Sequence, residues 1–414
     1  MTSNSKSLLL VLAGLALLSL QAWGRELHGC WLVPESIFDD DRTYSLQERR
    51  QRISGALDRM KGRGVDTVFV ESFVRGHATA RATAAANPVP VPARFLPAVR
   101  TEPDLLDLFI EEGRTRGMRI HAWIHVCYLR SDSITRGRED DDTPTLFQDL
   151  LTTEFRAVRE RTAVGSRARA AVDAVLESLE RGFDMRSLSD RLREAGFGLT
   201  HTPMETVIEL LAQSGIPGPA LFVYGPRGQL HSELDNAPNG SIYVDPAHAQ
   251  VRSRLLDMMQ SLVEEHPGLA GLHLDHVRYP EGDFGYDAQA ADGQARWVAP
   301  EPGARERAIS SLVTDCRTRL AGKAELSAAV VPGYYLGWPG SGGTQRGAAQ
   351  DWFSWGLDFY VPMLYAISGD KLASAMASYR RGLHGSAPVY PGIGSLGGGR
   401  GGSWVLFDYG KLKR

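Results

Sequence analysis

The feature that most constrains the fold is a regular alternation of strand and helix patterns along most of the chain. Short runs rich in β-branched and aromatic residues predict strands, and longer amphipathic stretches between them predict helices. The predicted strands are residues 28–33, 65–72, 118–126, 269–275, 325–331, 358–366 and 387–394. The predicted helices are residues 45–61, 103–117, 246–266, 304–322, 348–356 and 371–383.

A strand–helix order of this kind predicts a parallel sheet covered by helices, which is the α/β class. Seven or eight strands favour a (β/α)8 TIM-like barrel over a doubly wound sheet. No glycine-rich phosphate-binding loop follows the first strand, which argues against a dinucleotide-binding fold.

Two stretches interrupt the alternation. Residues from about 130 to 215 are rich in Arg, Glu and Leu and predict a helical insertion after the third strand, either a lid or substrate wall or a packed spacer. Residues 395–402 are mostly glycine and precede a predicted eighth strand at 403–410. Because a parallel connection needs at least ~10–12 residues, we expect an incomplete barrel at the C-terminus or a last strand that enters in another way.

The N-terminus has the pattern of a signal peptide over residues 1–24, with cleavage after Gly24. Its apolar run, residues 8–20, is short for a membrane span, although an uncleaved anchor is the alternative. We therefore expect a periplasmic or secreted protein, with one domain at 25–414 and no stable membrane insertion after cleavage. A net charge of −3 gives no sign of nucleic-acid binding. The three cysteines form no disulfide framework, and we expect them to be small buried hydrophobic residues.

Side chains alternate along a strand, so each strand has one face toward the helices and one toward the barrel interior. In 269–275 the leucines form the outer face, which leaves His273 and Asp275 facing inward. In 118–126 the same reasoning turns His121, Trp123 and His125 inward. Active sites of such barrels lie at the C-terminal ends of the strands. The residues expected at that rim are Glu35, Glu71, His125, Asp275 and Tyr365.

Two carboxyl groups beside aromatic rings suit glycosidic-bond hydrolysis, which needs one carboxylic acid and one carboxylate. We interpret Asp275 as nucleophile or base and Glu71 as the acid. The expected substrate-binding residues are His125, Arg278, Tyr365, His276, Trp123 and Glu35. The alternatives are structural. Asp275 could be an N-cap or pair with Arg278, and Glu71 could pair with Arg75. Glu35 could be a loop residue, and Trp123 could simply pack. The substrate would be a polysaccharide, with no cofactor and no metal.

Several motifs occur in an order that resembles the bacterial glycosyl-hydrolase-like family 10. They include "ELHGCWLV", "RGVDTVFVESFVRGHA", "MRIHAW", "LAGLHLDHVRYP" and "WFSWGLDFYVPMLYA", between about residues 26 and 394. The resemblance implies an exported (β/α)8 protein, and some members are similar to glycosidases that cleave peptide-free peptidoglycan glycan strands. Asp275 matches the first of two aspartates in the family's fourth-strand motif, which implies a catalytic or substrate-binding role.

The sequence departs from the family pattern at several rim positions. His276 replaces the second aspartate, and His125 replaces a polar residue that is usually Asn. Glu71 stands where many members have Gln, and the sixth strand lacks the usual Gln and Trp around Tyr365. The chain is thus a divergent member by this resemblance. These losses motivate a second hypothesis, a non-catalytic carbohydrate-binding protein on a degenerate barrel.

A third hypothesis is a metal-dependent hydrolase that uses His121, His125 and Asp275. The two histidines are four residues apart on one strand, ~13 Å by the strand rise. Because Zn²⁺ needs its ligands at ~2 Å, both cannot bind one ion. We therefore predict no metal site here.

Overall fold

The computed structural model describes residues 26–38, 43–91, 102–131, 145–181, 185–199, 202–230, 241–291, 294–332, 348–365, 367, 369–394, 402–407 and 409. The predicted signal peptide, residues 1–24, lies outside this part of the chain. Among the described helices, none combines the length and the apolar character that a membrane span requires. All three cysteines are buried thiols, as expected.

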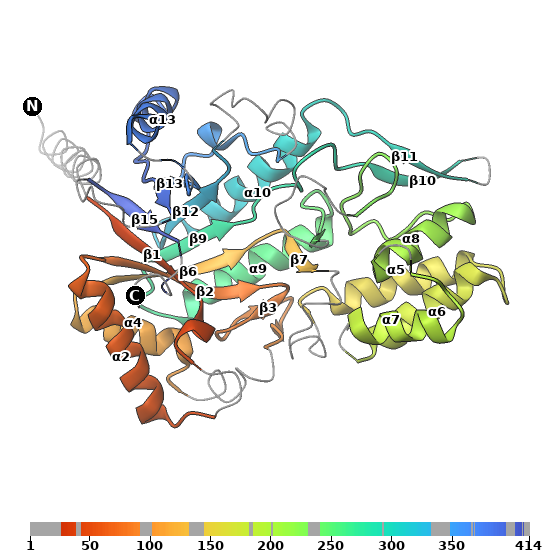
Figure 1. Ribbon diagram of the computed structural model, residues 1–414, viewed down its shortest axis with the longest axis horizontal. Coiled ribbons are helices and arrows are strands. Elements are labelled where there is room, and N and C mark those ends of the chain that lie inside the picture. The colour runs from red at the N-terminus through yellow and green to blue at the C-terminus, as the bar shows by residue number, and fades with distance from the viewer. Residues whose placement is uncertain are drawn as a thin grey trace, which may run out of the picture.

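Eight parallel strands form the barrel predicted from the sequence (Figure 1). In chain order they are β1 (His28–Leu32), β2 (Thr67–Val74), β6 (Arg119–His125), β9 (Gly271–Asp275), β12 (Glu325–Val330), β13 (Phe359–Pro362), β14 (Gly392–Ile393) and β15 (Trp404–Leu406). Parallel ladders join all neighbours from β1 to β13 in this order. The strand–helix alternation therefore gave the correct fold class.

The last two strands nearly close the barrel. β15 pairs in parallel with β14 on one side and with β1 on the other. Two isolated parallel bridges, Tyr360 to Val389 and Met363 to Gly392, connect β13 to the β14 segment. The eighth strand thus enters in parallel like the others, so the expectation that it would enter in another way is wrong. The expected incompleteness holds in part, because isolated bridges, and not a continuous ladder, join β13 to the β14 segment. β14 ends at Ile393 and β15 begins at Trp404, so ten residues connect the two strands instead of the expected eight, which is close to the ~10–12 that a parallel connection needs.

Helices cover the outside of the barrel: α2 (Leu46–Gly62), α4 (Leu105–Thr115), α9 (Ala249–Glu265), α10 (Ala304–Leu320) and α13 (Gly369–Gly382). Ser45 and Asp104 begin α2 and α4 with reciprocal capping boxes, which satisfy backbone N–H groups that have no partner inside a helix. The helix predicted at 348–356 is only a 3-10 turn, η4 (Trp352–Ser354), too short to count as a barrel helix. A second turn, η1 (Pro34–Ser36), follows β1.

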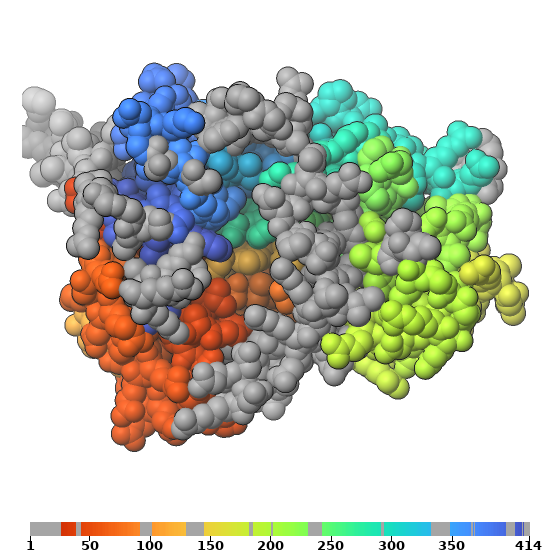
Figure 2. All heavy atoms as spheres, viewed as in Figure 1, coloured from red at the N-terminus to blue at the C-terminus, as the bar shows by residue number. Residues whose placement is uncertain are grey.

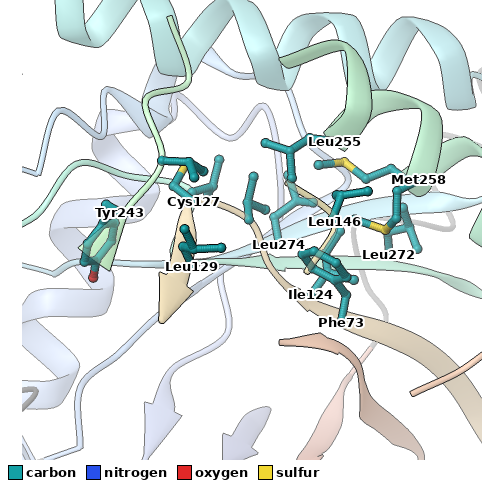
Figure 3. Packing of buried hydrophobic residues seen from close by; sticks show 14 of the residues in the cluster. Phe73, Ile124, Cys127, Leu129, Leu146, Tyr243, Leu255, Met258, Leu272 and Leu274 are labelled. Carbon is teal, nitrogen blue, oxygen red and sulfur yellow. The ribbon is translucent and has the colours of Figure 1, made fainter. Parts of the chain in front are cut away.

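Two hydrophobic clusters lie on the two faces of the sheet, as strand alternation predicts. The larger cluster fills the space between strands and helices and includes Ile124, Leu272 and Leu274, which Figure 3 shows packed against residues of α9. The smaller cluster lies inside the barrel and includes Trp31, Phe69, Trp123, Phe359 and Val361. The inward and outward faces assigned to the strands are therefore correct.

In the described part of the chain, the insertion after β6 contains four helices: α5 (Gln148–Arg161), α6 (Arg167–Leu179), α7 (Met185–Glu194) and α8 (Pro203–Gln213). It is flanked by the ribbon of β7 (Tyr128–Ser131) and β8 (Ser241–Tyr243). The hairpin β10 (Asp287–Ala291) with β11 (Gln294–Val298) packs against α8. Figures 1 and 2 show these helices as a yellow-green lobe on the side toward which β2 and β6 point.

Short strands complete the description: β3 (His77–Ala78), which pairs with β2, and the hairpin of β4 (Thr83–Ala84) and β5 (Asn87–Pro88). β4 lies against α9, where Ser261 Oγ accepts from the Thr83 backbone N–H at 2.7 Å. The β4–β5 segment, which follows β2, is therefore attached to the outer helix α9.

Candidate active site

The C-terminal ends of β2, β6 and β9 bring two carboxyl groups together. β6 lies between the other two strands, with His125 in register with Asp275 and Trp123 in register with Glu71. Because these positions share the inward face, the side chains of all four converge inside the barrel rim. Glu71 and Asp275 are both buried, with less than a tenth of each residue exposed.

His125 lies between the two carboxyl groups. Its Nε2 atom is 3.5 Å from Oε1 of Glu71 and 4.0 Å from Oδ2 of Asp275. These two oxygens are therefore at most ~7.5 Å apart, an upper limit that is compatible with the carboxyl separations of retaining glycosidases, ~5–5.5 Å, and with the lower part of the range for inverting ones, ~6.5–9.5 Å. Burial lowers the pKa of His125 to about 3, against the raising effect of Asp275. The imidazole is neutral at physiological pH.

Asp275 is held by two hydrogen bonds, one to each carboxylate oxygen. Trp123 Nε1 donates to Oδ2 at 3.1 Å, and the backbone N–H of His276 donates to Oδ1 at 2.7 Å. Burial raises the pKa of Asp275, but the neighbouring His276, through its ring and its backbone N–H, contributes to a net shift that brings this pKa below its ordinary value. Asp275 is consequently ionised at neutral pH, and Trp123 does more than pack.

A β-bulge follows Glu71 directly. The register between β2 and β6 shifts between Glu71 and Phe73, so Ser72 is the extra residue. After the shift Phe73 joins the outer hydrophobic cluster, although strict alternation would turn it inward with Glu71. The Thr79 hydroxyl donates to the Glu71 carbonyl at 2.6 Å and fixes the backbone there.

His276 occupies a left-handed conformation, with φ of 47°, directly after β9. Such a conformation is uncommon outside glycine, and it lets the His276 N–H turn back to Asp275. The ring stacks on Tyr128 at 5.2 Å, and the Tyr243 hydroxyl lies 3.1 Å from Nδ1. His276 thus joins the carboxylate to an aromatic group on the β7–β8 ribbon.

The other predicted residues lie in different surroundings. Tyr365 follows β13 and is 38% exposed. Arg278 is buried, with its guanidinium 5.6 Å from the centre of the Tyr243 ring. Glu35 lies half-buried in η1, directly beyond β1, and no role follows from this position. The Arg278 guanidinium therefore contacts the β7–β8 ribbon, and its predicted role in substrate binding stays a prediction.

Sequence reasoning missed two aromatic residues at the same rim. Trp31 of β1 contacts Tyr365 with ring centres 6.3 Å apart, and Phe407 contacts Tyr365 at 4.8 Å. Phe407 follows β15, where Val405 is part of the inner cluster. The alternation of residues 404–407 was the signal that could have identified Phe407 as inward-facing.

One cluster within the described part of the chain has the spacing of metal ligands: Asp104, Asp107 and His266. Asp104 accepts from the Asp107 backbone N–H at 2.9 Å as part of the α4 cap, and its Oδ2 lies 2.9 Å from His266 Nε2. The oxygen atoms of Asp104 and the Nε2 atom of His266, which a metal ion would need as ligands, therefore already form the bonds that join α4 to the end of α9. The cluster is accounted for as a structural ion pair.

No protein-family model and no curated protein sequence matches the chain. Among solved structures, it is similar to the glycoside hydrolase domain of PgaB (BpsB) from Bordetella bronchiseptica, with 10% identity, a TM-score of 0.48, and 89% of this chain and 84% of that chain covered. It is also similar to a family 20 β-N-acetylglucosaminidase, with 9% identity and a TM-score of 0.38, covering 91% and 56%.

A further similar structure is the Bacillus cereus spore cortex-lytic enzyme SleL, with 11% identity, a TM-score of 0.34, and 89% and 51% covered. The chain thus spans about half the length of the last two proteins. Two of these three structures carry the name glycoside hydrolase, and identities this low assign the present chain to no family.

Proposed function

We propose that the protein is a glycoside hydrolase that cleaves a polysaccharide with Glu71 and Asp275. The observation that carries this proposal is the placement of both carboxyl groups within 3.5 and 4.0 Å of one nitrogen atom of His125. They lie at the C-terminal rim of a (β/α)8 barrel, where enzymes of this fold have their active sites.

The surroundings of the two groups favour different roles. Asp275 accepts two hydrogen bonds and is ionised, which suits a nucleophile or a base that activates water. Glu71 would then protonate the departing glycosidic oxygen. His125 carries no charge at neutral pH, so it can donate a hydrogen bond without neutralising the charge on Asp275.

We further propose that the substrate is peptidoglycan glycan and that the protein works outside the cytoplasm. The motif order shared with the glycosyl-hydrolase-like family 10, of which the chain would be a divergent member, supports the first point. The signal-peptide pattern of residues 1–24 supports the second.

The test is release of soluble products from purified peptidoglycan glycan strands, with and without stem peptides. Asp275→Asn and Glu71→Gln should each lower the rate by about 10²–10⁴-fold. Asp190→Asn, on an exposed position of α7, is the control and should match wild type. Glu71→Gln should keep more activity on an aryl glycoside, because a good leaving group needs little protonation.

Three outcomes distinguish the hypotheses. Loss of product release in both carboxyl variants supports the hydrolase. Binding of glycan without cleavage by any form supports the carbohydrate-binding alternative. Full activity of Asp275→Asn would show that the carboxyl pair is structural.

A further inference from the structure

Two exposed aromatic side chains lie together at the barrel rim. Among the described residues, five large hydrophobic side chains are exposed: Leu46, Val164, Val298, Tyr365 and Phe407. Two of the five are aromatic, Tyr365 and Phe407, each 38% exposed. They contact each other, with ring centres 4.8 Å apart and planes inclined at 39°. Single exposed hydrophobic residues are common, but an adjacent pair at a rim suggests a binding surface.

This pair is connected to the candidate active site through buried rings. Trp31, 2% exposed, meets Tyr365 and Phe407 edge-on, each at 6.3 Å. On its other side Trp31 lies 6.4 Å from Trp123, the indole that donates to Asp275. A Cβ atom at position 392 would lie 3.1 Å from the Trp31 indole, so glycine at this position leaves space for the ring.

Asp275 is close enough to Tyr365 for its negative charge to affect the pKa of the phenol. The packing that partly removes the phenol from water and the negative charge of Asp275 both raise the pKa of Tyr365 well above its ordinary value. The Tyr365 hydroxyl is therefore protonated. It has no hydrogen-bond partner among the described residues, so it can bond to a bound molecule.

Aromatic rings of this kind suit one class of ligand. A pyranose ring presents C–H groups on one face, which pack on aromatic faces, and hydroxyls at its edge, which hydrogen-bond. The pair offers exposed aromatic surface from two rings and one phenolic hydroxyl. We propose that Tyr365 and Phe407 form a saccharide subsite that binds, by its C–H face, a sugar ring next to the bond to be cleaved. This proposal rests on the proposed hydrolase function and implies a substrate of at least two sugar rings.

The test measures binding separately from cleavage. The probe is soluble, peptide-free glycan of alternating N-acetylglucosamine and N-acetylmuramic acid, titrated calorimetrically into the Asp275→Asn protein. Adding Phe407→Ala should weaken binding roughly tenfold. Phe407→Tyr, which keeps a ring, should retain the affinity and guards against loss of folding. Val298→Ala, at an exposed hydrophobic position on the β11 strand, is the matched control.

The outcomes separate this subsite from the enzyme itself. Weaker binding by Phe407→Ala, with Phe407→Tyr and Val298→Ala unchanged, supports the subsite. Unchanged binding by Phe407→Ala, or no binding by Asp275→Asn at all, overturns it, even if wild type releases products. Ring-dependent binding without product release by wild type would keep the subsite and refute the hydrolase.

Discussion

A buried histidine below the candidate active site allows a direct test of how strongly the barrel interior excludes water from a titratable group. His273 lies on β9 with its ring 4.3 Å from Phe69, and its Nδ1 is 2.8 Å from the Ser327 hydroxyl. Its Nε2 atom has no hydrogen-bond partner in the described part of the protein. Burial lowers the pKa of His273 to about 3, although the charge of Asp275 opposes this.

The sign of the resulting pH dependence follows from proton binding. With an unfolded-state pKa of 6.5 and a folded-state pKa of about 3, the unfolded chain binds more protons between these values. Stability is therefore lost as the pH falls below 6.5, by about 1.4 kcal/mol per pH unit, or about 3 kcal/mol between pH 7.5 and 4.5. The lowered pKa of His125 acts in the same direction. His266 acts oppositely, because its pKa is raised: burial lowers it, but Asp104 outweighs this.

The assay is urea unfolding at pH 7.5 and pH 4.5 for wild type and His273→Asn, which keeps a donor near Ser327 but does not titrate. His384→Asn, at an exposed histidine in a left-handed turn, is the control. We expect His273→Asn to be less stable at pH 7.5 but to lose about 3 kcal/mol less on acidification. An equal loss in His273→Asn and wild type would refute the reasoning.

Two further predictions concern the groups around the barrel. Trp123→Phe removes a donor to Asp275, so the pKa of Asp275 should rise and the acidic limb of the kcat/KM profile should move to higher pH. An unmoved limb would show that Trp123 only packs. Asp104→Asn leaves the buried His266 without its ionic partner and should lower the free energy of unfolding by about 3–5 kcal/mol, as measured in urea at pH 7. A change below about 1 kcal/mol would exclude this structural role.

The fold and the direction of the inward side chains were predictable because they depend on local patterns. The strand 118–126 alternates apolar and polar residues, so Trp123 and His125 could be turned inward without knowledge of any neighbour. The order of strands placed Glu71 and Asp275 on strands separated by one other strand, which the sheet confirms.

Features that depend on contacts between distant segments could not be predicted in the same way. The bulge at Ser72 changes the facing of Phe73, and no residue pattern in β2 signals it. The contact of Arg278 with Tyr243 depends on the β7–β8 ribbon, which brings together segments more than 100 residues apart. The same holds for Phe407, whose position depends on where β15 enters the barrel.

The pairing of β1 with β15 also determines the order in which the strands of the barrel can pair during folding. The backbone N–H of Leu27 donates to the Ser403 hydroxyl at 3.0 Å, although the two residues are 376 positions apart in the chain. During synthesis β1 can pair with β2 early, but its other edge has no partner until residues 404–406 have been made. Such distant pairing makes folding slow. An unfinished chain would therefore expose the edge of β1 and lack Phe407 at the rim.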